Sequence, residues 1–209
     1  PEPQPDDVGQ MLKLQFSNIH RLQKILDHIL DLSRLEAGEV ELALRPVDAR
    51  PLLEDVAAGT RLVAGERGVA FEHRVPEALP PVRADGELLQ QVLGNLLDNA
   101  LRFARSRVVL SAEATPDETG VRFSVRDDGV GIPGDRLGDV FRKFVQVQRA
   151  ADGSGYKGTG LGLAICRQIV ERHSGRIWAE NGEGGGAAFH FVIPLAAPAR
   201  APGAAAPED

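Results

Sequence analysis

A heptad stripe near the N-terminus constrains the fold of this chain more than any other feature of its sequence. Between residues 10 and 36, apolar side chains recur at the spacing that gathers them on one face of a helix. The seam positions are Leu12, Ile19, Leu22, Leu26 and Ile29. One helix cannot bury its own apolar stripe, so a further helix, a second copy of the chain, or both must cover it.

After Gly38, which can end this helix as a C-cap, the hydrophobic pattern alternates between short strands and amphipathic helices. Strands are predicted at 40–44, 69–75, 107–114, 121–127, 176–180 and 187–193. Helices are predicted at 48–67, 85–104 and 161–173. This order predicts an α+β fold, an α/β sandwich in which helices cover one face of a mixed, mostly antiparallel sheet, preceded by the long N-terminal helix.

Composition narrows the classes of function. The net charge of −6 argues against binding a nucleic-acid backbone by bulk charge. The single cysteine, Cys166, lies in an apolar helical run and is predicted to be a packed thiol. No apolar stretch is long enough to span a bilayer, and the low-complexity ends, 1–9 and 197–209, are expected to be mobile tails. We therefore expect no nucleic acid, no membrane contact by these residues, and a cytoplasmic location, with a membrane anchor still open for a longer parent protein.

Three segments carry residues suited to chemistry. In the first, a predicted helix at 88–104, Gln91, Asn95 and Asn99 recur every four residues on one face, and Arg102 joins its edge. Amide oxygens suit Mg²⁺, and an arginine suits phosphate oxygens. The same pattern also fits an ordinary amphipathic helix with solvated amides, so by itself it leaves both interpretations open.

The second segment, 125–133, places Asp127 and Asp128 at the end of a predicted strand, directly before Gly129 and Gly131. Glycines there let the chain turn tightly and let its backbone approach a flat ligand. A carboxylate at the turn can accept a hydrogen bond from an exocyclic amine such as that of adenine. A simple Asp-Gly turn between two strands is the alternative.

In the third segment, 157–163, three glycines precede a predicted helix. Free backbone N–H groups at a helix start, together with the helix dipole, can bind an anion. Glycine-rich turns before helices are frequent, and this one matches neither the GxxxxGK[ST] phosphate loop nor a dinucleotide fingerprint after a strand. The order of the three segments is therefore more informative than any one of them.

Taken in order, these segments resemble a known family. NLLDNALRF, DDGVGIP, KGTGLGLAI and the tail GGGAAFHFVIP are similar to the boxes of the ATP-binding domain of sensor histidine kinases, which belong to the GHKL superfamily. The upstream ILDLSRLEAG resembles the end of their second dimerisation helix, so the resemblance covers about residues 11–195. It implies that residues 10–38 form the second helix of a dimerisation and phosphoacceptor hairpin and that residues 39–196 form an ATP-binding catalytic domain.

The resemblance implies roles for individual residues. Asn99 corresponds to the asparagine that ligates Mg²⁺, and Asn95 to the first asparagine of the same box. Arg102 replaces a usual lysine and is expected to contact phosphates, and Phe103 corresponds to the aromatic position beside the nucleotide. Asp127 corresponds to the aspartate that hydrogen-bonds the adenine amino group.

Glycines and two phenylalanines complete the implied site. Gly129 and Gly131 accompany the adenine-binding aspartate, Asp128 replaces a frequent asparagine, and Phe141 and Phe144 match the phenylalanine box before a mobile lid. The residues expected at the phosphates are Lys157, Gly158, Thr159, Gly160, Leu161 and Gly162. The last glycine box comprises Gly184, Gly186 and Ala187, of which Ala187 replaces a usual serine or threonine.

Asn95 also predicts the type of reaction. In the ATPases of the superfamily a glutamate at this position acts as the general base that activates water, whereas an amide cannot accept a proton at neutral pH. Slow hydrolysis would leave the γ-phosphate of ATP for an acceptor histidine, from which it passes to an aspartate of a response regulator. Asn95 and Arg102 are therefore the expected catalytic residues.

The acceptor histidine is expected on a helix that this sequence does not contain. None of its histidines lies in the acceptor motif of the family; they are His20, His28, His73, His173 and His190. His20 and His28 are expected to be partly exposed on the first helix, and His173 to be a structural imidazolium at a helix C-terminus.

Two other functions remain open at this point. The chain could be a nucleotide-gated module that binds a partner or dimerises without kinase activity, or a protein-serine kinase of the anti-sigma type, although those lack a dimerisation helix. The kinase interpretation predicts ATP and Mg²⁺ as ligands. It also predicts three partners: an acceptor-histidine helix in cis or in trans, a response regulator, and a second copy of the chain bound through residues 10–38.

Overall fold

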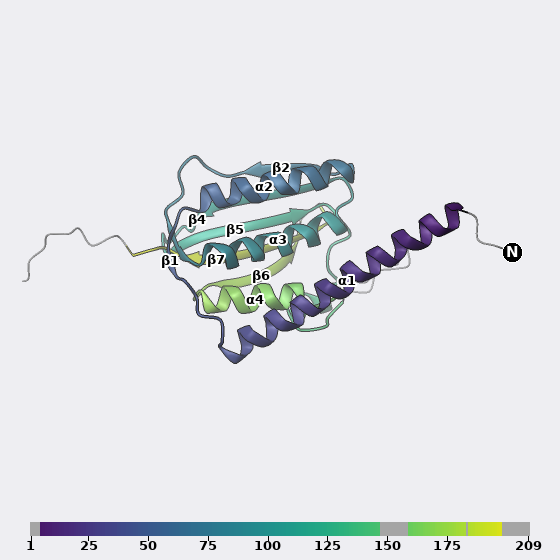
Figure 1. Ribbon diagram of the computed structural model, residues 1–209. Coiled ribbons are helices and arrows are strands. Elements are labelled where there is room, and N and C mark those ends of the chain that lie inside the picture. Colours follow the sequence, from purple (N-terminus) through teal and green to yellow (C-terminus); the bar gives the residue numbers. More distant parts are fainter. Residues whose placement is uncertain (1–4, 147–158, 183, 198–209) are drawn as a thin grey trace, which may run out of the picture.

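The computed structural model describes residues 5–146, 159–182 and 184–197, with only some of the side chains before residue 25 (Figure 1). A long N-terminal helix, α1 (Pro5–Ala37), leads into an α/β sandwich. α1 begins before residue 10, inside the segment expected to be a tail. It ends at Gly38, the predicted C-cap, whose N–H donates to the Leu35 carbonyl oxygen at 3.3 Å.

The apolar stripe of α1 is exposed along most of the helix. Leu22 and Leu26 are 60% and 59% exposed, whereas Leu32 and Leu35 are buried against the sandwich. Only the C-terminal part of α1 therefore packs on the domain, beside α4 (Gly162–Arg172), and the rest projects past it (Figure 1). None of the described helices, α1 included, is both long and apolar enough to cross a membrane.

The main sheet has five strands in the order β2-β4-β5-β7-β6. β2 (Ala70–Arg74) runs parallel to β4 (Arg107–Ala114). β5 (Gly120–Asp127) pairs antiparallel with both β4 and β7 (Ala187–Pro194), and β6 (Arg176–Asn181) pairs antiparallel with β7. This topology confirms the predicted mixed, mostly antiparallel sheet.

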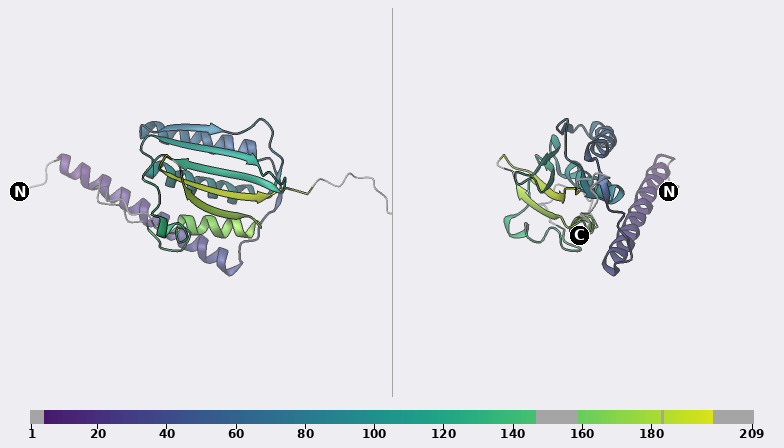
Figure 2. Two further views of the ribbon diagram at one scale, coloured as in Figure 1. Left: turned by 180° about the vertical axis from the view of Figure 1, so that it is seen from behind. Right: turned by 90° about the vertical axis from the view of Figure 1, so that its left-hand side faces the viewer.

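Three helices cover one face of this sheet, and in the view from behind none of the described helices lies on its other face (Figure 2). α2 (Ala49–Glu66) and α3 (Gly86–Phe103) begin after Asp48 and Asp85, whose carboxylates accept hydrogen bonds from N–H groups of the first turn. Both helices lie where the periodicity predicts them. A short 3₁₀ helix, η1 (Gly134–Arg136), follows the turn after β5.

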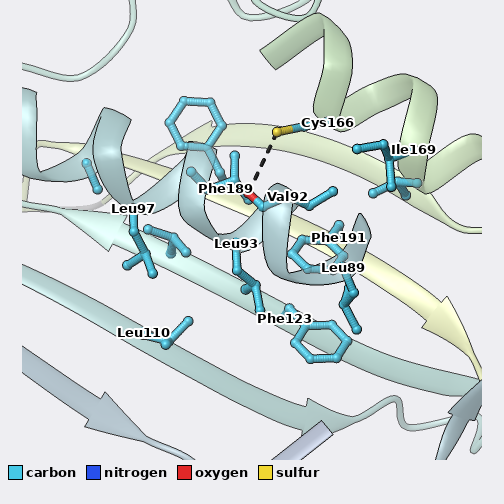
Figure 3. Close-up of a cluster of buried hydrophobic side chains, with 14 of the residues drawn as sticks. Leu89, Val92, Leu93, Leu97, Leu110, Phe123, Cys166, Ile169, Phe189 and Phe191 are labelled. Atoms are coloured by element: carbon cyan, nitrogen blue, oxygen red, sulfur yellow. Dashed lines mark hydrogen bonds between the residues drawn. The ribbon is translucent and has the colours of Figure 1, made fainter. Parts of the chain in front are cut away.

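The core lies between α3, α4 and the sheet (Figure 3). Leu89 on α3 lies close to Phe123 and Phe191, whose stacked rings have centroids 4.7 Å apart. Cys166 is fully buried with its Sγ 3.7 Å from the Val92 carbonyl oxygen, so it is the packed thiol that the sequence predicts. Burial raises the pKa of the Cys166 thiol to about 12, which keeps it uncharged and unreactive.

The prediction of a strand at 40–44 is wrong. The structure has no strand there; β1 lies at Arg45–Val47 and pairs antiparallel with β3 (Val82–Ala84), which the sequence pattern did not reveal. The apolar alternation before β1 has another cause, because Val40 packs against the core and its carbonyl oxygen accepts a hydrogen bond from Arg172. Strands of three residues are too short for a periodicity to identify.

Candidate functional site

The polar face of α3 serves two purposes. The Gln91 Nε2 donates to the Asp31 Oδ2 on α1 at 2.8 Å, so this amide joins the two helices and is not part of the candidate site. Asn95 and Asn99, one and two turns further along, are half-buried on the same face. The structure therefore leaves two of the three aligned amides for a ligand.

Asn95 lies beside the start of α4. A Cβ placed on Gly162 would lie 3.8 Å from the Asn95 Cγ and 4.0 Å from the Cε1 of His28 on α1, so three elements meet around this point. The Asn95 Nδ2 is buried and makes no well-formed hydrogen bond within the described ranges, although it lies close enough to the Cys166 thiol to lower the pKa of that group. Buried polar atoms are nearly always satisfied in folded proteins, so this amide group indicates a position for a polar ligand.

The start of α4 is open to an anion. Its N-cap residue, Leu161, provides no side-chain cap for the N–H groups of the first turn, which carry the positive end of the helix dipole. Gly160, with φ +70°, comes so close to Phe144 that a Cβ would lie 2.8 Å from its backbone carbon, so only glycine fits. Lys157 and Gly158, also predicted at the phosphates, lie outside the described residues.

A buried carboxylate marks the other end of α3. Asp127 is 3% exposed, and its Oδ1 accepts hydrogen bonds from the N–H groups of Gly129 at 2.8 Å and Ala187 at 3.3 Å. A Cβ on Gly129 would overlap the Phe103 carbonyl oxygen, so a glycine is needed for the turn to reach α3. The Cζ of Arg102 lies 5.2 Å from the centre of the Phe103 ring, in cation–π contact.

Asp128 has a different task from its neighbour, because successive side chains at a strand end point to opposite sides. Its Oδ1 accepts hydrogen bonds from the N–H groups of Arg105, Ser106 and Arg107 at 2.9 to 3.0 Å. Partial burial acts to raise the pKa of Asp128, but the hydrogen bonds from the Ser106 side chain and the three amides prevail and hold that pKa well below its usual range. Asp128 thus fixes the turn between α3 and β4.

Asn181 is a positioning residue that the sequence analysis missed. Its Oδ1 accepts from the Ile132 N–H at 2.8 Å and its Nδ2 donates to the Ile132 carbonyl oxygen at 2.7 Å, so one amide ties the turn at 129–133 to β6. The two residues are 49 positions apart, and no local pattern connects them. Gly131, the second predicted glycine of the turn, packs against the same Asn181 amide.

The two phenylalanines predicted to precede the lid lie in different environments. Phe141 is buried, with its ring edge-on to Phe189 at a centroid distance of 6.2 Å, so it belongs to the core. Phe144 is 67% exposed, and its N–H donates to the Gly160 carbonyl oxygen at 2.9 Å, which links the phenylalanine segment to the second glycine segment.

The predicted residues thus gather along one helix. Asn95 faces the start of α4, and Phe103, eight residues later, contacts the turn of Asp127 and Gly129. Eight residues of α-helix span about 12 Å, so the two ends are far enough apart to contact different parts of one elongated ligand. A buried acceptor at one end and unsatisfied donors at the other match the polarity of an adenine base and a phosphate chain.

One histidine differs from expectation, and another is partly exposed as expected but makes a contact that the sequence did not predict. His173 is not an imidazolium: the Asp85 N–H donates to its Nε2 at 3.0 Å, and its Nδ1 lies 2.7 Å from the Ile169 carbonyl oxygen, so a neutral ring with the proton on Nδ1 fits both contacts. His28 is half-buried, with its Nδ1 3.3 Å from the Thr159 Oγ1. The side chain of His20 lies outside the described residues.

Comparison with known proteins identifies the family of the chain. Residues 84–197 match the model of the family described as histidine kinase-, DNA gyrase B-, and HSP90-like ATPase. The adaptive-response sensory kinase SasA of Synechocystis sp. is 29% identical over 195 residues, which cover 93% of this chain and 50% of SasA. The chain therefore spans about half the length of this relative.

Solved structures give the same result. Full-length ShkA in complex with AMPPNP superposes with a TM-score of 0.78 at 33% identity, covering 96% of this chain and 41% of ShkA. The histidine kinase ThkA, in complex with the response regulator protein TrrA, superposes with a TM-score of 0.74 at 27% identity, covering 93% of this chain and 53% of ThkA.

Proposed function

Because the chain belongs to the family of histidine kinase-, DNA gyrase B- and HSP90-like ATPases, we propose that it is the ATP-binding catalytic portion of a sensor histidine kinase. It transfers the γ-phosphate of ATP to a histidine on a dimerisation helix that this sequence does not contain. The phosphoryl group then passes to an aspartate of a response regulator. The likeness to the adaptive-response sensory kinase SasA and to ShkA, solved in complex with AMPPNP, supports this function.

The observation that carries the proposal is the arrangement along α3, with an acidic turn at one end and an uncapped helix start at the other. Asp127 accepts a hydrogen bond from the adenine amino group, and Phe103 contacts the nucleotide beside it. The N–H groups from Gly160 to Gly162 bind phosphate oxygens. Arg102 starts from the adenine end of α3, over the Phe103 ring, and its long side chain would extend toward the phosphates and bring a positive charge to them.

Asn95 and Asn99 determine the chemistry of the site. Asn99 would hold Mg²⁺ through its amide oxygen, and this ion would neutralise charge on the phosphates. The Asn95 amide cannot take a proton from water, so the site orients ATP without activating a water molecule against it. An imidazole supplied from outside is then the competent nucleophile.

Two partners follow from the proposal. The complex of ThkA with TrrA supports a response regulator as the recipient of the phosphoryl group. The exposed apolar residues of α1, among them Leu22 and Leu26, suit a second copy of the chain in a helical bundle.

Two measurements test this function. Calorimetry with AMPPNP should give saturable binding that depends on Mg²⁺. Incubation with γ-labelled ATP and a separately purified dimerisation domain of a related kinase should place label on its histidine. The label should be lost in acid, because phosphohistidine is acid-labile; acid-stable label would point to a protein-serine kinase instead.

The main alternative is a nucleotide-gated module without kinase activity. The contact of His28 on α1 with Thr159 favours some coupling between this helix and the nucleotide site. Tight AMPPNP binding without transfer to any acceptor domain would support the alternative and contradict the kinase proposal.

A further inference from the structure

One contact of α1 lies at the phosphate end of the candidate site. The Nδ1 of His28 lies 3.3 Å from the Oγ1 of Thr159, a residue 131 positions away in the sequence. The His28 ring also faces Gly162 and the Asn95 amide. A side chain of the N-terminal helix thus reaches the turn whose N–H groups we assign to phosphate binding.

The Thr159 hydroxyl already has a second task. It accepts a hydrogen bond from the N–H of Leu161, the N-cap residue of α4, at 3.2 Å. A hydroxyl that accepts from an N–H can still donate its own proton, and the His28 Nδ1 receives it when the ring carries its proton on Nε2. His28 therefore holds Thr159 in the place where its oxygen satisfies the Leu161 amide.

This contact belongs to a wider docking of α1. The face of α1 that carries His28 also carries Asp31, Leu32 and Leu35, at helical spacing. Leu32 and Leu35 are buried, and Asp31 accepts from Gln91 on α3. Of these four residues, His28 lies nearest the free end of the helix.

We propose that His28 is a positioning residue of the nucleotide site, through which α1 competes with nucleotide phosphate for the start of α4. A phosphate oxygen that takes the Leu161 N–H must displace the Thr159 hydroxyl, which then loses its geometry toward His28. By linkage, docked α1 weakens nucleotide binding, and bound nucleotide weakens the docking of α1 by the same factor. This inference rests on the proposed ATP site and adds its regulation.

Calorimetry on the whole chain with AMPPNP and Mg²⁺ tests the competition. His28→Ala removes the contact, and the affinity should rise roughly 3- to 10-fold, the range of one ordinary hydrogen bond. His28→Asn keeps an acceptor near the Nδ1 position and should restore the wild-type affinity. Gln23→Ala, an exposed change on α1, is the matched control and should have no effect.

A double-mutant cycle separates this role from a merely structural one. Thr159→Val removes the bridging hydroxyl, and adding His28→Ala in that background should change the affinity no further. Unchanged or weaker binding by His28→Ala, with Gln23→Ala normal, would overturn the inference while leaving the ATP site intact. Absence of nucleotide binding by the wild type would instead overturn the proposed function and the inference with it.

Discussion

The two ends of the candidate site are built in different ways. At the end proposed to bind adenine, Asp127, Asp128 and Asn181 each accept hydrogen bonds from backbone N–H groups within the sandwich, and these bonds fix the turn. At the end proposed to bind phosphates, the buried Asn95 Nδ2 makes no well-formed hydrogen bond in the described part of the chain, and Thr159 is held by α1. The hydrogen bonds that shape the first end are formed without a ligand. At the second end, a ligand can replace existing contacts.

This difference has a physical meaning. A rigid acceptor for the base gives selectivity at little cost in entropy, because nothing must be ordered on binding. Exchangeable contacts at the phosphates allow another element, here α1, to respond to whether a nucleotide is bound. Substitutions at the rigid end should therefore change affinity and stability together, and those at the exchangeable end affinity alone.

The largest effect is expected at Asp127. Asp127→Asn keeps an oxygen toward Gly129 but loses the negative charge, and AMPPNP affinity should fall about 10- to 100-fold, the value of a hydrogen bond to a charged group. Calorimetry measures the change. Asp55→Asn, an exposed aspartate on α2, serves as the control and should bind as the wild type does. Equal affinities of the two variants would remove Asp127 from the site.

Asn181→Ala tests the rigidity of the same end. The substitution deletes both hydrogen bonds to Ile132 and leaves the peptide groups of a half-buried turn unpaired. The free energy of unfolding should fall by about 1–3 kcal/mol, and nucleotide affinity should fall with it. Urea denaturation gives the first quantity and calorimetry the second. A loss of stability with unchanged nucleotide affinity would show that the turn binds the base without the two hydrogen bonds from Asn181.

Asn99→Ala tests the proposed metal ligand, which lies on α3 between the two ends. Affinity for AMPPNP should fall about 5- to 10-fold in the presence of Mg²⁺ and be unchanged in its absence, while stability stays within about 0.5 kcal/mol of the wild type. Gln90→Ala, an exposed amide on the same helix, is the matched control. A variant that still responds fully to Mg²⁺ would place the metal ligand elsewhere.

The smallest expected effect is the pH dependence of stability that Asp128 contributes. The pKa of folded Asp128 lies below the ordinary value of about 3.9, so its ionised form stabilises the fold above that pH. This contribution is lost as the pH falls from about 4 toward the folded-state pKa. Asp128→Asn should be less stable than the wild type by about 1 kcal/mol at neutral pH, with a gap that narrows below pH 4. Denaturation curves at several pH values would show it, and a constant gap would contradict it.

Much of the fold could be predicted from the sequence. The periodicities and the caps at Asp48 and Asp85 placed α2 and α3, and the alternation of strands and helices indicated the sandwich. β1 and β3 were not predicted, because a strand of three residues is too short to show a hydrophobic periodicity and these two strands form by pairing with each other.

The residues of the candidate site could be predicted from the sequence, but the residues that hold them in position could not. Spacing on one helix aligned Asn95 with Asn99, and the fold brings Gly162 and Asp127 to that helix. Asn181 and the contact of His28 with Thr159 depend on partners 49 and 131 residues away. Such pairings are set by tertiary packing, which a local pattern does not encode.

The order of strands in the sheet has a consequence for folding. β4 with β5 and β6 with β7 are hairpins that can form locally, but the pairing of β5 with β7 brings together residues such as Asp127 and Ala187, which are 60 positions apart. Closing so long a loop carries a large entropic cost, so we expect this pairing to limit the folding rate. The loop contains α4 and the glycine-rich turn. The two ends of the site therefore meet only when the sheet is complete, and a chain that has stalled as two separate hairpins would be unable to hold a nucleotide.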